Sequence, residues 1–207
     1  VDDCSSDASP ALLRQAAGSF PELRAFRHQR QCGQSTALVT GVRQARAPWI
    51  ATLDGDGQND PRDIPKLQAV VNDPGRSPAL GMVAGHRAKR RDSWLKRMSS
   101  RLANGVRGRL LQDHTPDTGC GLKLFNREAF LALPHFDHLH RFLPALFQRA
   151  GLQVISVPVN HRPRTRGRSH YGVGNRLWVG IVDMLGVMWL QRRSRLPQGV
   201  DDLTRKD

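Results

Sequence analysis

Cysteine, aromatic residues and long apolar runs are all scarce in this chain. Its 207 residues include 6% aromatic side chains and three cysteines, Cys4, Cys32 and Cys120. Three cysteines without metal-ligand spacing are too few for a disulfide scaffold and predict free thiols in a reducing compartment. Few aromatic rings leave few platforms on which nucleic-acid bases can stack. No apolar stretch is long enough and uncharged enough for a comfortable membrane span.

Acidic residues are outnumbered, and the imbalance is uneven along the chain. The formal net charge is +14, from 32 Lys/Arg and 18 Asp/Glu. Residues 1–75 hold eight basic and nine acidic side chains, whereas residues 76–207 hold 24 basic and nine acidic ones. This distribution predicts a near-neutral first part and a basic second part that faces an anionic partner, either nucleic acid or an anionic membrane.

Short apolar runs alternate with helical patterns, which predicts an α/β sandwich with a mainly parallel central sheet flanked by helices. We expect helices over residues 9–17, 33–45, 63–71, 93–111 and 141–150. We expect extended segments over residues 23–28, 48–53, 81–85, 119–125 and 152–160. The helix over 93–111 has a basic face, which suits either a solvated surface or contact with anionic lipid.

The last apolar segment, over residues 175–190, carries Asp183 near its centre and a tryptophan near each end. Arginines follow it, and this pattern is typical of an interfacial anchor, with a buried core helix as the alternative. We therefore divide the chain into a main domain over 1–172, an amphipathic or membrane-interface helix over 173–193, and a disordered tail over 194–207.

Two carboxylates, Asp54 and Asp56, follow the apolar run over 48–53. Asp60 and Pro61 then resemble an N-cap and a first helical position, so the carboxylates are predicted on a strand-to-helix loop. Ligands bind at such loops in open parallel sheets, and oxygen ligands suit Mg2+ or Mn2+. An acidic, glycine-rich turn is the alternative interpretation of these residues alone.

Four ordered motifs carry a resemblance to a known family. The string LDGDGQNDP resembles the metal-binding motif of family 2 inverting glycosyltransferases, in the branch that transfers a sugar from a nucleotide diphosphate to a polyprenyl phosphate. VDDCSSD at residues 1–7 resembles the early VDDGSSD motif of that branch, which dolichol-phosphate mannosyltransferase represents. DTGCGLK at 117–123 and the segment from HRPR at 161–164 to Tyr171-Gly172 resemble two later motifs.

The resemblance runs from Val1 to about Trp189 and implies a GT-A type fold. It implies that Asp54, Asp56 and Gln58 hold the metal, and that Asp2 and Asp3 contact the nucleoside. A strand and turn precede VDD in the family. Since the chain has neither a starting methionine nor a signal peptide, we expect it to be a fragment without that first strand.

The same resemblance assigns residues to the phosphates. It implies that Arg87 and Arg101 bind the acceptor phosphate and that Asp117 orients or deprotonates the acceptor, although Asp117 also suits a capping role. Gly105 replaces a serine that relatives can place beside that phosphate, and His170 replaces their usual lysine. The residues implied to close over the donor diphosphate are Arg162, Arg164, Arg168 and Ser169.

Together these patterns predict a metal-dependent transferase that moves a sugar from GDP-mannose or a UDP-sugar to dolichyl or undecaprenyl phosphate. We expect it in the cytoplasm, peripherally bound to the inner membrane face, in contact with anionic lipid and without nucleic acid. Two alternatives remain open: transfer to a glycan hydroxyl in envelope polysaccharide synthesis, and a basic nucleic-acid-binding protein. The histidines at 135, 138 and 140 are predicted to form a surface turn rather than a metal site.

Overall fold

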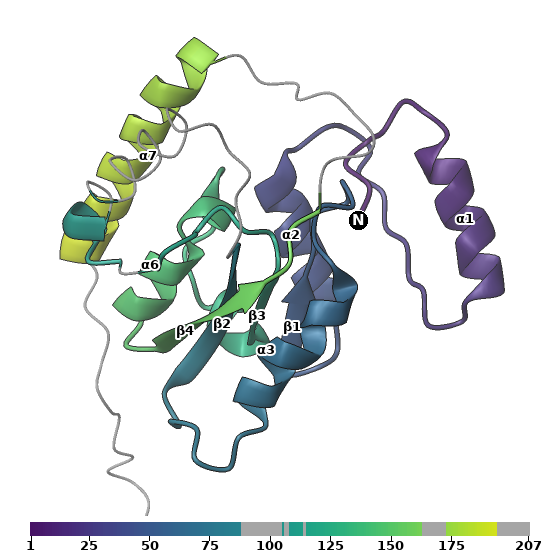
Figure 1. Ribbon diagram of the computed structural model, residues 1–207. Coiled ribbons are helices and arrows are strands. Elements are labelled where there is room, and N and C mark those ends of the chain that lie inside the picture. The colour runs from purple at the N-terminus through teal and green to yellow at the C-terminus, as the bar shows by residue number, and fades with distance from the viewer. Residues whose placement is uncertain (88–104, 106–107, 114, 163–172, 194–207) are drawn as a thin grey trace, which may run out of the picture.

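The structure is a computed structural model that describes residues 1–87, 105, 108–113, 115–162 and 173–193 (Figure 1). The expected basic helix over residues 93–111 therefore lies almost entirely outside the described residues, and so do Arg101, Arg164, Arg168, Ser169, His170 and the expected tail. Within the described part, one sheet is flanked by helices on both faces (Figure 1).

The sheet has four strands in the order β1-β3-β2-β4. Their bounds are Trp49–Thr52 for β1, Leu80–Arg87 for β2, Lys123–Asn126 for β3 and Gln153–Val159 for β4. β3 pairs antiparallel with both β1 and β2, and β2 pairs parallel with β4. Three strands therefore share one direction, as expected, but the inserted β3 makes the described sheet mixed rather than mainly parallel in its pairings.

The helices are α1 at Ser9–Ser19, α2 at Gln34–Gln44, α3 at Ile64–Val71, α5 at Arg127–Leu131, α6 at Leu143–Arg149 and α7 at Val173–Arg193. Two 3-10 turns lie at Pro61–Asp63 and Leu139–Arg141, and the described residues 108–111 are also helical. The predicted cap at Asp60 is confirmed, because its side chain accepts a hydrogen bond from the backbone N–H of Arg62 at 3.1 Å. Asn126 caps α5 in the same way, through Ala129 N at 2.9 Å.

Two apolar clusters cover the two faces of the sheet. One packs α2, α5, α6 and α7 around Phe125, Phe130 and Phe147, and the other packs α3 against Val83 and Leu124. Adjacent strand residues belong to opposite clusters, since side chains alternate between the faces of a strand. This burial fixes the position of each strand end, where the polar residues lie.

The expected extended segment over residues 23–28 is not a regular strand. Its sheet-like contact is a single parallel bridge between Asp2 and Arg27, with backbone hydrogen bonds from Asp2 N to Phe26 O and from His28 N to Asp2 O. Most of its side chains are exposed, so no apolar face holds it against the sheet. Helix α1 beside it buries none of its residues.

Helix α7 has one packed face and one open face. Val187 is fully buried in the larger cluster, with Met184 and Met188 packed against it, and Arg149 Nε of α6 donates to Leu190 O at 3.1 Å. The residues that remain 53–68% exposed are Trp178, Val182, Leu185 and Trp189. Among the described residues, no helix combines the length and hydropathy needed to cross a membrane.

His140 is more enclosed than the predicted surface turn implied, and it should make stability pH-dependent. Ser35 Oγ lies 2.8 Å from its Nδ1, and burial, reinforced by the charge of Lys123, lowers the pKa of His140 from 6.5 to about 4. Because the unfolded chain then binds the proton more readily, His140 contributes stability above pH 6.5 that is lost as the pH falls toward 4. A shift of this size corresponds to roughly 3 kcal/mol.

The measurement is urea unfolding between pH 4 and pH 7.5 for the wild type and for His140→Gln. We expect the free energy of unfolding of the wild type to fall more steeply below pH 6.5 than that of the variant. Parallel curves would show that His140 is not the titrating group.

Candidate active site

The polar residues gather at one edge of the sheet because of the strand directions. β1, β2 and β4 end at this edge and the antiparallel β3 begins there, which brings together the loops after Thr52, at Arg87, before Lys123 and after Val159. Two contacts join these loops: Thr52 Oγ1 donates to Gly121 O at 3.0 Å, and Asn59 bridges to His161.

Asp54 lies at the centre of this edge. Its Oδ1 accepts a hydrogen bond from Gln34 Nε2 of α2 at 2.8 Å, and its backbone N–H donates to Asn59 Oδ1 at 3.3 Å. Burial raises the pKa of Asp54, and the negative charge of Asp56 raises it further, while the cations Lys123 and Arg87 oppose the rise. Asp54 and Asp56 are thus close enough to repel each other, and a divalent cation would relieve this repulsion.

Asp56 and Gln58 form a tight turn beside Asp54. Asp56 Oδ1 accepts from Gln58 N at 3.1 Å, and Gln58 Nε2 lies 3.4 Å from His161 Nε2. The carboxylate and amide oxygens of Asp54, Asp56 and Gln58 are the donor set that Mg2+ or Mn2+ prefers. Together with the raised pKa of Asp54, this donor set makes the loop chemically suited to a divalent metal.

Arg87 and Asp117 form a bidentate ion pair on the other side of the edge. Arg87 Nε donates to Asp117 Oδ2 at 2.6 Å and Arg87 Nη2 to Asp117 Oδ1 at 2.7 Å, and the Arg87 backbone N–H adds a bond at 3.2 Å. Asp117 is 6% exposed. The sequence predicted both residues at the acceptor but not their pairing, which makes Asp117 a positioning partner of Arg87.

Lys123 is a buried cation that received no role from the sequence. Its ammonium donates to Cys120 O, and its charge acts on both Asp54 and Asp117. Burial lowers its pKa. The sequence could have indicated this buried cation, because a lysine inside the otherwise apolar string GLKLF is expected to be buried and to need polar partners. Gln34, the neighbour of Asp54, left no comparable signal.

The loop after β4 contacts the loop that carries Asp54, Asp56 and Gln58. Arg162 Nη2 pairs with Asp60 Oδ2 at 2.5 Å, and Arg162 N donates to Gln58 O at 2.9 Å. Arg162 is therefore brought to the predicted metal site. Its side chain is held by Asp60, whose pKa is lowered mainly by the Arg62 backbone hydrogen bond.

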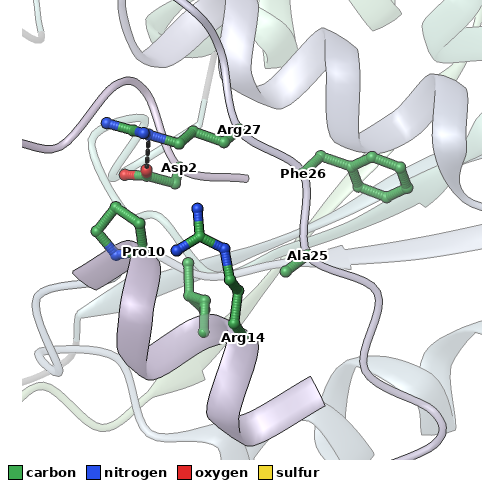
Figure 2. A pocket seen from close by; sticks show the side chains of 7 residues that line it. Asp2, Pro10, Arg14, Ala25, Phe26 and Arg27 are labelled. Carbon is green, nitrogen blue, oxygen red and sulfur yellow. Dashed lines mark ion pairs between the residues drawn. The ribbon is translucent and has the colours of Figure 1, made fainter. Parts of the chain in front are cut away.

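Asp2 lies beside α1 and the segment over residues 23–28. Asp2 pairs with Arg27 Nε at 3.1 Å and accepts from Ser5 N at 3.1 Å. Asp2 also lines a shallow pocket beside α1, with Pro10, Arg14 and Phe26 among its other walls (Figure 2). That pocket lies outside the strand-end loops that hold Asp54 and Asp117.

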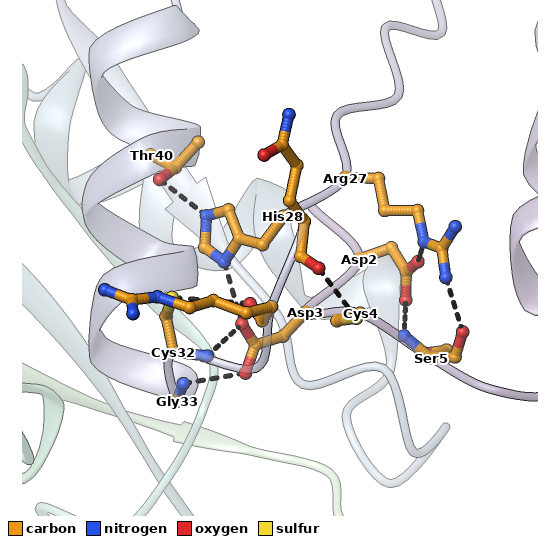
Figure 3. Close-up of polar contacts among 11 residues, drawn as sticks. Asp2, Asp3, Cys4, Ser5, Arg27, His28, Cys32, Gly33 and Thr40 are labelled. Atoms are coloured by element: carbon orange, nitrogen blue, oxygen red, sulfur yellow. Dashed lines mark hydrogen bonds and ion pairs between the residues drawn. The ribbon is translucent and has the colours of Figure 1, made fainter.

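Asp3 is linked to the loop that carries Asp54 and Asp56 by hydrogen bonds at the start of α2. It accepts from Gly33 N at 2.7 Å (Figure 3), and the next residue, Gln34, donates to Asp54. The structure thus brings Asp54, Asp56, Gln58, Arg87, Asp117 and Arg162 to one edge, and it links Asp3 to that edge through Gly33 and Gln34, while Asp2 pairs with Arg27.

Gly121 sets the position of Asp54, and its substitution should weaken metal binding. A Cβ atom at Gly121 would lie 2.2 Å from Asp54 Oδ2 and 2.4 Å from Asp54 Cγ, so the carboxylate must move. We expect Gly121→Ala to lower Mn2+ affinity by about tenfold or more while the fold is kept, a loss typical of disturbed metal-site support.

The matched control is Gly55→Ala, in the metal-binding loop itself, where an added Cβ would meet nothing within 4 Å. Calorimetric titration with Mn2+ should leave Gly55→Ala close to the wild type. Equal affinities for the wild type and Gly121→Ala would show that the ion does not depend on the position of Asp54.

Comparison with known proteins gives a consistent result. The profile described as Glycosyl transferase family 2 matches residues 1–133. A dodecaprenyl-phosphate galacturonate synthase of Rhizobium johnstonii is 35% identical over 95% of this chain and 58% of its own length. An undecaprenyl-phosphate 4-deoxy-4-formamido-L-arabinose transferase of Edwardsiella ictaluri is 34% identical over 84% and 52%. The chain thus spans little more than half the length of these curated relatives.

Solved structures share the fold at low identity. A mannosyltransferase of Pyrobaculum calidifontis in complex with GDP-Man and Mn2+ superposes with a TM-score of 0.57 and 21% identity, over 95% of this chain and 55% of that one. A glucosyl-3-phosphoglycerate synthase of Mycobacterium tuberculosis with Mn2+ and UDP gives 0.62 and 16%, over 92% and 67%. The predicted GT-A type fold is confirmed.

Proposed function

The chain belongs to glycosyl transferase family 2, and on that premise we propose that it transfers a sugar from a nucleotide-diphosphate sugar to a polyprenyl phosphate. The names of the curated relatives support this acceptor class. The observation that carries the proposal is the meeting of Asp54 and Asp56 with the Arg87–Asp117 pair at one edge of the sheet. One side suits a metal-bound diphosphate and the other suits a lipid phosphate.

The donor half uses the loop after β1. In this proposal Asp54, Asp56 and Gln58 would hold Mg2+ or Mn2+, and a bound ion would supply positive charge to stabilise the leaving diphosphate. Gln34 and Gly121 keep the Asp54 carboxylate in one position. Arg162 lies beside this loop through Asp60, and Arg164 and Ser169 complete the donor set by motif. Asp2 and Asp3 are assigned to the nucleoside.

The acceptor half uses the end of β2. A guanidinium group binds phosphate oxygens with the same bidentate geometry that Arg87 uses toward Asp117. Asp117 fixes the plane of this guanidinium, and in this proposal the oriented group also contacts the incoming anion. Since a polyprenyl phosphate already carries an anionic oxygen, the reaction needs positioning more than proton removal. Arg101 is the second arginine assigned to that phosphate.

Helix α7 is proposed to rest on an anionic membrane surface. Its exposed apolar residues recur at the spacing of one helix face, from Trp178 through Val182 and Leu185 to Trp189, and Arg192 and Arg193 follow at the exposed end. Apolar residues enter the lipid interface while arginines bind anionic headgroups. This contact would place the enzyme at the cytoplasmic membrane face, where the lipid acceptor is embedded.

The proposed function is tested with a panel of radiolabelled nucleotide sugars, polyprenyl phosphate and Mn2+. We expect label to enter the organic phase only with the lipid phosphate and a divalent ion, and dolichyl and undecaprenyl phosphate are compared in parallel. A parallel reaction with a glycan acceptor examines transfer to a hydroxyl. Incorporation into the glycan alone would refute the lipid acceptor.

Removing the tryptophans of α7 should weaken membrane binding. We expect the affinity of the double variant Trp178→Ser, Trp189→Ser for anionic vesicles, measured by co-sedimentation, to fall by about tenfold or more. The reason is that each exposed indole contributes apolar area at the interface. Phe20→Ser is the matched control, since Phe20 is 61% exposed but lies after α1. Equal loss in both proteins would contradict a specific role for α7.

A further inference from the structure

One side chain from the start of the chain and two from the segment before α2 meet beside the start of that helix. They are Asp3, His28 and Cys32, and one ligand atom from each lies within 4.8 Å of the others (Figure 3). His28 Nδ1 is 2.7 Å from Asp3 Oδ1, and all three residues are partly buried. In the part of the chain that the structure describes, no other group of histidine, cysteine and acidic residues has this proximity.

Hydrogen bonds hold these groups close to one another. Cys32 N and Gly33 N donate to the two oxygens of Asp3 at 2.8 and 2.7 Å, which fixes the carboxylate. His28 Nε2 lies 2.9 Å from Thr40 Oγ1. Nδ1 lies 2.7 Å from Asp3 Oδ1, so these two groups share a hydrogen bond in the metal-free protein. A metal ion would displace the proton of that hydrogen bond and take the lone pair of Nδ1, while Nε2 keeps its contact with Thr40.

We propose that Asp3, His28 and Cys32 form a second metal site, which binds Zn2+. One oxygen, one imidazole nitrogen and one thiolate sulfur match the ligands of tetrahedral zinc, with a fourth position left for water. This set is softer than the carboxylate and amide oxygens of Asp54, Asp56 and Gln58, so the two sites select different ions. Asp3 lies 25 residues before His28 in the sequence, so spacing alone did not bring it together with His28 and Cys32.

A zinc ion here would tie the first residues of the chain to α2. Cys32 is two positions before Gln34, whose side chain holds Asp54. Zinc would therefore brace the segment that supports the proposed magnesium or manganese loop. This ion is separate from the ion that would bind the donor diphosphate. Because Asp3 is also assigned to the nucleoside, Zn2+ bound here would compete with the nucleoside for that carboxylate.

The test is a titration of the metal-free protein with Co2+ in excess Mg2+, which occupies the oxygen site. We expect one bound Co2+ and a thiolate-to-cobalt charge-transfer band that Zn2+ abolishes by displacement. Cys32→Ser should lose the band, and His28→Gln should weaken Co2+ binding by about tenfold or more. Cys4→Ser is the matched control, because Cys4 Sγ points to Gln29 O at 3.4 Å, and it should keep the band.

Thermal melting provides an independent readout. Zn2+ should raise the melting temperature of the wild type and of Cys4→Ser but not that of Cys32→Ser, and the three proteins should melt alike without metal. A wild type without a charge-transfer band, or a band that survives in Cys32→Ser, would overturn the proposal. Neither result would affect the transfer assay with polyprenyl phosphate, so the two proposals fail independently.

Discussion

Replacing Asp56 with alanine is expected to lower the rate of sugar transfer by about a thousandfold or more, because it removes a ligand of the ion that neutralises the leaving diphosphate. Metal ions contribute several kcal/mol of transition-state stabilisation, and each 1.36 kcal/mol corresponds to about tenfold in rate. Asp56 is partly buried, and its Oδ1 accepts a hydrogen bond from Gln58 N within its own turn. The fold should therefore survive the substitution.

The rate is measured with saturating donor, and folding is checked by thermal melting. Asp73→Ala is the matched control, because Asp73 accepts a loop hydrogen bond from Gly75 N in the same way but lies after α3. It should retain full activity. Turnover of Asp56→Ala near the wild-type rate would rule out the assignment of this carboxylate to the metal.

The second large effect is expected at Arg87. Arg87→Ala leaves Asp117 buried without its bidentate partner, and breaking such a pair costs about 3 kcal/mol of stability. Transfer should fall by about a hundredfold or more, since a preorganised donor to the acceptor phosphate is lost. Arg87→Lys should recover part of the stability but little of the rate, because an ammonium cannot form the planar double contact.

A double-mutant cycle separates the structural from the functional loss. Arg87→Ala combined with Asp117→Asn should be more stable than the sum of the single changes predicts, because no unpaired buried charge remains. Its transfer rate should stay low. If stability and rate recovered together in the double variant, Arg87 would act only as the partner of Asp117 and not on the acceptor.

The sequence was most informative where local signals decide the structure. The apolar run before Asp54, the cap at Asp60 and the proline after it predict a strand, a loop and a helix start, and all three are confirmed. The helices at Ser9, Gln34 and Ile64 follow from periodicity in the same way. The family resemblance is confirmed by the match over residues 1–133.

Long-range pairing was not accessible in this way. Nothing local shows that Lys123–Asn126 inserts antiparallel between β1 and β2, yet this insertion delivers Asp117 to Arg87 and buries Lys123 between two carboxylates. The segment over residues 23–28, which was expected to be extended, pairs through the bridge between Asp2 and Arg27. It does not become a regular strand, because most of its side chains are exposed. The cluster of Asp3, His28 and Cys32 depends on the same tertiary placement.

The most direct test is to measure Mn2+ binding in the presence of a nucleoside diphosphate. Bound Mn2+ is detected as a loss of the electron paramagnetic resonance signal of the free ion. The central claim is that Asp54 and Asp56 bind the catalytic ion. It predicts one Mn2+ per chain in the wild type, tighter when UDP or GDP is present, and none in the double variant Asp54→Ala, Asp56→Ala. Equal Mn2+ binding by the wild type and the double variant would contradict it.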